Sequence, residues 1–504
     1  MSAYSLEEAL HPKSIAVVGA SERGRGSQFF TALVDLGFKG KIYPVNPKYS
    51  EVSSLKAYPS VKDIPDPVDY VISAAPAPQV SQIMKDCAEK GVKCIHLFTA
   101  RFSETGRQDA IDLEKEVLGI AREGGVRIIG PNCMGLYNPG LGIGWDSDFP
   151  KETGSVGLAS QSGQAAREII GKTTQRGVFF NKAVSYGNAI DFNECDFLEY
   201  YGNDPEITLI MMYIEGPKDG NRLFNILREV TRTKPVVIIK GGRGQSGTRA
   251  VSSHTASLAG SMEIWNTMIG QAGAVAVSSI EELIDTAVSF YFLPPITGRR
   301  VGVAAGAGGA TVLAADQCEE AGLDVIALPQ EIRDELRSQG VQIWDWIGNP
   351  ADFSINMGDV DFAAPQLLKM MAMNPNFDLI IASVGAPGGG GPPGGRPGGG
   401  GRPGGGGRPG GGGRPGGGGP PWANQPMSIE AFIDQYKQIN DYKPVLGLVQ
   451  DRTPSTNDMD EERWKSICEV TAKLIDLRIP YYPTISRAAK AASRVIDYYQ
   501  SRER

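Results

Sequence analysis

The stretch "SIAVVGASERGRGSQFF", residues 14–30, has the pattern of a buried strand, a glycine-rich turn and the start of a helix. Five small or apolar residues lead directly to Gly19, and Ser21, Gly24 and Gly26 follow before the apolar helical stretch begins. Glycine accepts the backbone conformations that a tight strand-to-helix turn requires. We therefore predict a βα unit, the building block of a parallel sheet, near the N-terminus.

The same alternation continues through a first predicted domain, residues 1–148. Strands are predicted at 41–46, 68–76, 92–98 and 126–130, with helices at 28–37, 78–91 and 106–125. The pattern restarts with strands at 155–160, 179–187, 207–216 and 234–242, which defines a second domain, residues 149–293. After the linker "PPITGRR" it restarts again with strands at 301–309, 377–384 and 443–450, which defines a third domain, residues 298–504. The predicted fold class is α/β, with three consecutive parallel-sheet domains.

A glycine-, proline- and arginine-rich insert, residues 387–421, interrupts the third domain, and Arg-Pro recurs in it at 396, 402, 408 and 414. Such a composition cannot bury apolar surface, so we predict that the insert is disordered. One interpretation is a tolerated surface insertion. The alternative is a segment that binds RNA or a protein partner, although aromatic residues that could stack on bases are absent from it.

Replacement of residues 387–421 by a short linker is expected to leave turnover and melting temperature unchanged. The reason is that a flexible loop's ends can be joined at a small entropic cost. Steady-state assays and thermal unfolding of the deletion variant check this. Loss of activity in a stable variant would instead favour the binding role.

Composition limits the class of protein. Hydrophobic residues make up 41% of the chain and charged residues 21%, which is typical of a globular protein, and the net charge of -7 disfavours nucleic-acid binding. The sequence offers no signal peptide and no apolar run long enough to span a membrane, so we expect a cytoplasmic protein. The six cysteines are scattered without a CxxC pair, which argues against disulfides and a zinc site.

Three glycine turns are candidate phosphate sites, because amides at a helix start favour anions. The first is the turn at Gly19, whose spacing differs from the GxGxxG fingerprint of NAD-binding proteins. The others are grouped around Ser160, Ser162 and Gly163, and around Gly306, Gly308 and Gly309. For each turn the alternative is that the glycines only permit a tight bend.

His254 lies in the loop segment "SSHTASLAG", residues 252–260, among small and hydroxylated neighbours. A neutral imidazole can attack phosphorus with one nitrogen while the other keeps its proton on a carboxylate. Glu215, at the end of a predicted neighbouring strand, is the candidate carboxylate. The alternative is an exposed loop histidine and an unrelated acid. His11 and His96 are predicted to be structural.

Several segments in order resemble the NDP-forming (ADP-forming) acyl-CoA synthetases, relatives of the succinyl-CoA synthetase alpha subunit. The resemblance covers most of the chain, and it is carried by "SIAVVGAS", "YPVNPK", "FTARFSETG", "GPNCMGLYNP", "ASQSGQ", "SYGNAIDF", "YIEG", "SHTASLAG" and "NPADF". Two positions depart from the family pattern, since Ala256 and Arg101 stand where glycine is usual, and the insert has no family counterpart.

The resemblance implies site residues at matching positions. His254 matches the histidine that is phosphorylated and Glu215 the acid that orients it, while Ser162 and Gly163 match a phosphate-binding helix start. The residues that match the CoA site of a Rossmann-like first domain are Gly19, Ala20, Ser21, Lys48, Pro76 and Thr99. The second and third domains then correspond to flavodoxin-like ligase domains. No metal site is implied on this chain.

The resemblance also implies a reaction. A carboxylic acid, CoA and a nucleoside triphosphate are converted reversibly into acyl-CoA, nucleoside diphosphate and phosphate, through an acyl phosphate and a phosphohistidine. No segment resembles the family's ATP-grasp domain, so Mg²⁺ and ADP/ATP or GDP/GTP are expected on a beta-type partner subunit in a hetero-oligomer. Two alternatives stay open: a CoA transferase or other acyl-CoA-dependent transferase that needs no nucleotide, and a non-enzymatic CoA-binding protein.

Overall fold

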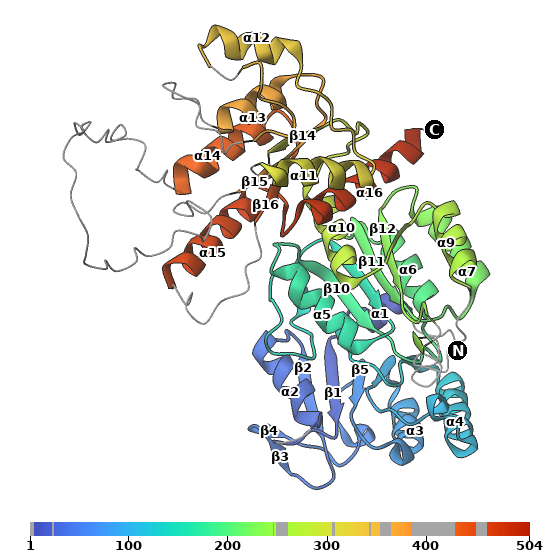
Figure 1. The fold of residues 1–504 in the computed structure, drawn as a ribbon. Helices are drawn as coiled ribbons and strands as arrows, with labels where there is room; N and C mark the ends of the chain where they lie inside the picture. The colour runs from blue at the N-terminus through green and yellow to red at the C-terminus, as the bar shows by residue number, and fades with distance from the viewer. Residues whose placement is uncertain are drawn as a thin grey trace, which may run out of the picture. The chain divides into compact units, whose positions relative to one another are not determined.

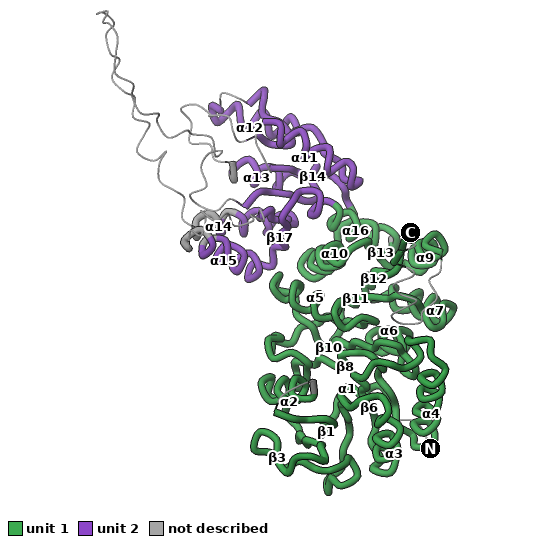
Figure 2. The backbone as a smooth tube through the Cα atoms, turned by 60° about the horizontal axis from the view of Figure 1, so that its bottom comes forward, with its two compact units in different colours: residues 1–297, 490–504 green, residues 298–489 purple. Residues whose placement is uncertain are grey.

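The computed structural model describes residues 5–22, 25–244, 246–247, 261–304, 308–341, 344–352, 364–384, 429–449 and 461–503. These residues form two compact units (Figure 2): unit 1 is residues 1–297 with 490–504, and unit 2 is residues 298–489. The insert at 387–421 lies outside the described residues. Unit 1 holds two of the three main sheets, so the boundary placed between residues 148 and 149 remains a prediction.

The first sheet of unit 1 is parallel, with the strand order β2-β1-β5-β6-β7. Its strands are β1 Ser14–Val18, β2 Lys41–Val45, β5 Tyr70–Ser73, β6 Cys94–Leu97 and β7 Arg127–Ile129, and a small hairpin of β3 Glu51–Val52 and β4 Leu55–Lys56 follows β2. Every residue of β1 is buried, because helices cover both faces of the sheet.

Two groups of helices cover the first sheet. In Figure 1, α3 (Val80–Lys90) and α4 (Gln108–Gly124) lie side by side and pack on the face that carries Ala16 and Val71. The opposite face, which carries Ile15 and Ile72, packs against α2 (Arg25–Leu36) and α1 (Leu6–Leu10). The strands and the helices α2, α3 and α4 match the sequence prediction to within a few residues.

The second sheet of unit 1 has the order β13-β12-β11-β9-β10-β8. Its parallel strands are β9 Val156–Ser160, β10 Phe180–Ser185, β11 Leu209–Ile214, β12 Val236–Lys240 and β13 Val275–Val277. The helices around it are α5 Gly163–Thr174, α6 Glu194–Asn203, α7 Gly220–Val230, α9 Met262–Gln271 and α10 Ile280–Phe292. Helices α5 and α10 contact each other, whereas α6, α7 and α9 form a separate packed row.

One strand differs from the all-parallel prediction. Strand β8, Gly135–Tyr137, pairs antiparallel with β10 at the edge of the second sheet, in a segment predicted to be a loop. Three residues that include glycine give too short a pattern for a strand to be recognised, and an antiparallel edge strand is common on a parallel sheet. Its residues precede position 148 although they belong to the second sheet.

Unit 2 contains a four-stranded parallel sheet in the order β14-β15-β16-β17. Its elements are β14 Val301–Ala304, α11 Gly309–Glu320, α12 Gln330–Ser338, α13 Ala364–Met373, β15 Leu379–Ser383, α14 Ile429–Asn440, β16 Val445–Leu448, α15 Glu461–Asp476, β17 Tyr481–Tyr482 and α16 Ile485–Glu503. From Lys490 onward, α16 belongs to unit 1, where Tyr498 Oη donates to Thr231 O over 3.3 Å. The predicted α/β class with mostly parallel sheets is confirmed.

The structure also bears on the cysteines, on membrane-spanning helices and on metal ligands. All six cysteines are free, and all but Cys468 are buried. No described helix combines the length and the apolar character needed to cross a membrane. Among the described residues, no group of three histidine, cysteine or acidic side chains is arranged to hold a metal ion.

Candidate functional site

The predicted CoA residues of the first sheet gather at one edge. Gly19, Lys48, Pro76 and Thr99 each follow the carboxyl end of a different strand, namely β1, β2, β5 and β6, and these strands are neighbours in the sheet. The chain leaves β1 toward β2 on one side and returns to β5 on the other, so β1 and β5 flank a topological switch point. Open α/β sheets bind ligands at such a point, outside the carboxyl ends of the strands.

The turn after β1 is shaped by two glycines. Gly19 has a φ of +88°, and its amide donates to Val45 O over 2.9 Å. A Cβ on Gly26 would lie 2.0 Å from Gly19 O, so only glycine allows α2 to begin this close to the turn. Asn46 fixes the turn from β2, because its Nδ2 donates to Ala20 O over 2.8 Å while its Oδ1 accepts from Lys48 N over 3.0 Å. Sequence reasoning missed Asn46, although it stands inside the "YPVNPK" motif.

Substitution Gly19→Val is expected to weaken CoA binding at least about tenfold. A left-handed backbone conformation costs a branched residue about 1–2 kcal/mol. The new side chain would also stand over the switch point, because a Cβ on residue 19 would lie 3.5 Å from the carbonyl carbon of Ala74. Calorimetric titration with CoA checks this. Gly37→Val is the matched control, because Gly37 has a similar φ of +78° and no atom near its Cβ. If the folded Gly19→Val variant binds CoA with the wild-type affinity, CoA does not bind at this turn.

The start of α5 provides a second set of backbone donors. Ser162 is the N-cap, and its Oγ accepts from Ala165 N over 3.3 Å, while Ala166 N donates to Ser162 O. The amides of Gly163 and Gln164 have no hydrogen-bond partner among the described residues. Two open amides at a helix N-terminus suit an anion. This start follows β9, and β9 and β11 flank the switch point of the second sheet.

Glu215 stands on the other side of that switch point, one residue after β11. Its amide and that of Gly216 donate to Gln161 Oε1 over 2.7 and 3.2 Å, and its carbonyl oxygen accepts from Lys240 Nζ over 2.6 Å. Tyr213 Oη donates to Glu215 Oε1 over 3.4 Å, and burial and this carboxylate raise the pKa of Tyr213 to about 12. Glu215 Oε2 is buried and has no hydrogen-bond partner among the described residues. Oε1 of the Glu215 carboxylate is therefore held by Tyr213, and Oε2 remains available as an acceptor.

The loop 130–134 contacts strand-end residues of both sheets of unit 1. Asn132 N donates to Thr99 O over 3.0 Å at the first sheet. Met134 N donates to Ser185 Oγ over 3.1 Å, and a Cβ on Gly163 would lie 2.5 Å from Met134 Cγ at the second sheet. The structure thus brings the predicted CoA residues and the predicted phosphate residues to opposite sides of one short loop within unit 1.

The segment "FTARFSETG" is tied to the same region through Glu104. The amides of Arg101 and Phe102 donate to its carboxylate, and Asn188 Nδ2 donates to Glu104 Oε2 over 2.7 Å. Arg101 has a φ of +81°, which explains in backbone terms why glycine is usual at this position.

His254 and the whole segment 248–260 lie outside the described residues. The structure therefore places Glu215, Ser162 and Gly163, while the position of His254 stays a prediction. The other two histidines have contacts that explain them structurally. His96 is buried with Nε2 3.0 Å from Cys133 O, and burial lowers its pKa to about 4, whereas the His11 ring contacts Glu7.

The third glycine turn has a different character. Gly306 lies outside the described residues, and Gly308 N donates to Asp352 Oδ2 over 2.7 Å. The amide of Gly308, at the start of α11, is therefore already hydrogen-bonded to a carboxylate of the protein. Among the described residues, the helix start at Gly163 and Gln164 keeps open amides, whereas the amides of Gly19 and Gly308 donate to Val45 O and to Asp352 Oδ2.

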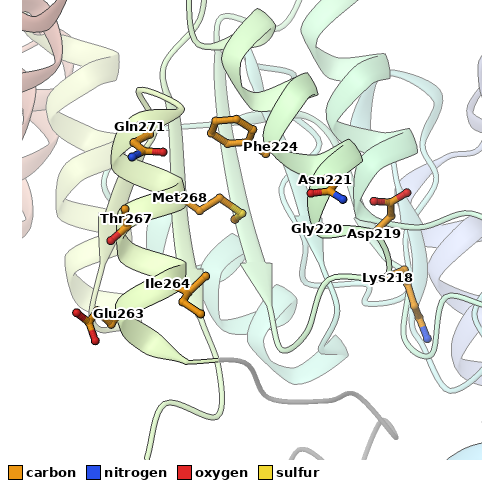
Figure 3. Close-up of a pocket in the computed structure, with 10 residues that line it drawn as sticks. All are labelled: Lys218, Asp219, Gly220, Asn221, Phe224, Glu263, Ile264, Thr267, Met268 and Gln271. Carbon is orange, nitrogen blue, oxygen red and sulfur yellow. The ribbon is translucent and has the colours of Figure 1, made fainter.

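A cavity of about 850 Å³ lies between α7 and α9 (Figure 3). In that view Asp219 and Asn221 mark the start of α7, and Ile264 and Thr267 project from α9. The lining residues are Lys218, Asp219, Gly220, Asn221, Phe224, Glu263, Ile264, Thr267, Met268 and Gln271. They include none of the predicted site residues, so the sequence prediction gives this cavity no role.

Two family models match the segments that form the two sheets of unit 1. Residues 13–139 match the CoA binding domain family, and residues 153–290 match the succinyl-CoA ligase like flavodoxin domain. The chain is 38% identical over 379 residues to the acetate–CoA ligase [ADP-forming] II subunit alpha of Pyrococcus furiosus, which covers 75% of this chain and 82% of that protein. It is also 38% identical to acetate–CoA ligase [ADP-forming] I of Archaeoglobus fulgidus, of which it spans 54%.

Solved structures extend the similarity to the whole chain. The acetyl-coenzyme A synthetase 1 of Ca. Korarchaeum cryptofilum, solved with phosphate and ADP, matches with a TM-score of 0.75 and 27% identity, over 99% of this chain and 98% of that one. A protein from Pyrococcus horikoshii OT3 matches with a TM-score of 0.72 and 28% identity, over 99% of both chains. The family predicted from the sequence motifs is confirmed: this chain belongs to the ADP-forming acyl-CoA synthetases, a family of acid–thiol ligases.

Proposed function

We propose that this chain is the alpha-type subunit of an NDP-forming acyl-CoA synthetase that transfers phosphate through His254. The observation that carries the proposal is the pair of contacts made by the loop 130–134, with Thr99 at the carboxyl edge of the first sheet and with Gly163 at the helix start of the second. The alpha subunit from Pyrococcus furiosus, 38% identical, supports the subunit type. CoA and a small carboxylic acid are then the substrates on this chain.

In the first step phosphate attacks the thioester carbonyl of acyl-CoA. The carbon–sulfur bond breaks, CoA leaves as the thiolate, and an acyl phosphate remains. The open amides at Gly163 and Gln164 provide hydrogen bonds to phosphoryl oxygens without having to reorganise. The side chain at the Ser162 cap keeps these amides directed out of the helix start.

In the second step a ring nitrogen of His254 attacks phosphorus, and the bond from phosphorus to the acyl oxygen breaks, which releases the carboxylic acid. The second ring nitrogen keeps its proton on Glu215, whose Oε2 is the open acceptor. The phosphohistidine then gives its phosphoryl group to a nucleoside diphosphate. We propose that the nucleotide, ADP or GDP, and Mg²⁺ bind a beta-type ATP-grasp subunit, so the working enzyme is a hetero-oligomer.

Reconstitution tests this function. The chain is mixed with a beta-type subunit, acetyl-CoA, phosphate and ADP, with acetyl-CoA as the probe because similar proteins are acetate–CoA ligases. We expect ATP and free CoA to form together, and only when phosphate and ADP are both present. Transfer of CoA between acids without nucleotide would support a transferase instead. CoA binding without any turnover across a panel of acyl-CoAs would support a non-enzymatic CoA-binding protein.

A further inference from the structure

Lys240 is a buried lysine at the end of β12, next to Glu215. Strands β11 and β12 are neighbours (Figure 1), with Ile214 opposite Lys240 in the register. The Lys240 side chain is almost wholly enclosed, since the residue is 3% exposed. Its Nζ donates to Glu215 O over 2.6 Å and to Gly241 O over 3.2 Å, and it lies 5.6 Å from the centre of the Trp265 ring.

No carboxylate of the described residues forms an ion pair with Lys240. Lys182, which is also buried, lies with its Nζ 2.8 Å from the Asp204 carboxylate, whereas the half-buried Lys234 donates to the backbone carbonyl oxygen of Asp204 over 2.5 Å. Burial of an ammonium group without a direct ion pair has a desolvation cost. Consistent with this cost, burial lowers the pKa of Lys240, and the nearby Glu215 opposes the shift. A buried lysine that is held by backbone carbonyl oxygens rather than by an ion pair is a candidate for a functional role.

The contacts of Lys240 complete a clamp around one residue. Gln161 Oε1 holds the amide of Glu215 from the β9 side, and Lys240 holds its carbonyl oxygen from the β12 side. With both polar groups of its backbone hydrogen-bonded, the Cα–Cβ bond of Glu215 has a fixed direction, and Tyr213 Oη contacts its Oε1. The clamp also links Glu215 to the phosphate-binding helix start, because Gln161 directly precedes Ser162.

We propose that Lys240 is a positioning residue for phosphoryl transfer: it fixes the backbone of Glu215 from β12 and places an ammonium group beside this residue. This inference rests on the proposed function, because the carboxylate matters only if it orients His254. Gln161 is the second half of the clamp. A lysine with a purely structural role would stabilise the fold without affecting the phosphoryl-transfer step.

The chain offers a matched control for this role. Lys234 lies two residues before β12 begins and also donates to two backbone carbonyl oxygens, those of Tyr201 at 2.9 Å and Asp204 at 2.5 Å. Burial lowers the pKa of Lys234 as well. Lys234→Met and Lys240→Met therefore each remove an ammonium group that donates to two backbone carbonyl oxygens, one before the start of β12 and the other at its end.

The experiment measures phosphorylation of His254 in the full chain, with acetyl-CoA and phosphate as probes, by mass spectrometry at neutral pH. We expect Lys240→Met to slow labelling about 10–100-fold, to lower kcat in the reconstituted enzyme by a similar factor, and to leave KM for acetyl-CoA within about twofold. Lys234→Met is expected to label at the wild-type rate. If Lys240→Met does not fold, Lys240→Gln, which retains a donor without the charge, takes its place.

The outcomes separate this inference from the function on which it rests. If the wild type is labelled and the two lysine variants are labelled at equal rates, the role of Lys240 is overturned but the proposed function is not. An effect of Lys240→Met on KM without an effect on kcat would also overturn it. Unlabelled wild type would overturn the proposed function itself.

Discussion

Replacement of His254 by asparagine is expected to abolish both phosphoryl labelling of the chain and overall ligation, by a factor on the order of 10⁴ or more. Asparagine has a similar size but no nucleophilic ring nitrogen, so the acyl phosphate has no acceptor on this chain. CoA affinity should stay unchanged, because the predicted CoA residues lie at the first sheet, whereas Glu215, the predicted partner of His254, lies at the second.

The measurement compares ATP formation in the reconstituted enzyme with CoA titration of the same protein. His11→Asn is the control, because it removes an imidazole whose contacts are with Glu7. It should retain full activity. Normal ligation in a folded His254→Asn variant would remove the phosphohistidine mechanism and favour a transferase.

Glu215→Gln is expected to slow phosphorylation of His254 by roughly 100-fold while the chain stays folded. The amide is isosteric and preserves the backbone contacts with Gln161 and Lys240. It removes the charge that stabilises the protonated ring nitrogen, and it can present a donor where the open Oε2 acceptor stood. Labelling rates and circular dichroism of the variant check both halves of this expectation.

Glu194→Gln is the matched control for the loss of a buried carboxylate. Glu194 also has a buried Oε2 without a hydrogen-bond partner among the described residues, and its Oε1 accepts from Lys218 N over 2.6 Å. Burial raises the pKa of this carboxyl. We expect Glu194→Gln to label within about twofold of wild type. Equal losses in the two variants would mean that removal of any buried acid perturbs this unit, and Glu215 would lose its assigned role.

The sequence was sufficient for the sheets and for most of the strand-end residues. Strands such as β1 and β12 are continuous apolar runs between glycines and helical segments, so their positions could be predicted without a partner strand. The same runs predict where carboxyl ends lie, and this placed Gly19, Ser162 and Glu215 at strand ends. Strand β8 was missed because its three residues depend on pairing with β10 rather than on their own pattern.

Residues that act through a neighbour were beyond sequence reasoning. Gln161 and Lys240 are distant in sequence from Glu215, and only the strand order β12-β11-β9 brings them to its two sides. A lysine that ends an apolar strand is a signal for Lys240, but it does not say what the ammonium contacts. In the third glycine turn, Asp352 takes the amide of Gly308, a contact across more than forty residues that no local motif encodes.

The most direct test of the account is the location of the phosphoryl group on the wild-type chain. The protein is incubated with acetyl-CoA and phosphate, digested at neutral pH, and its peptides are analysed by mass spectrometry. The phosphohistidine mechanism predicts one phosphoryl group on the peptide that contains His254, and this group should be labile in acid and stable in base. Absence of the group, or a base-labile group on Ser253, Thr255 or Ser257, would contradict it.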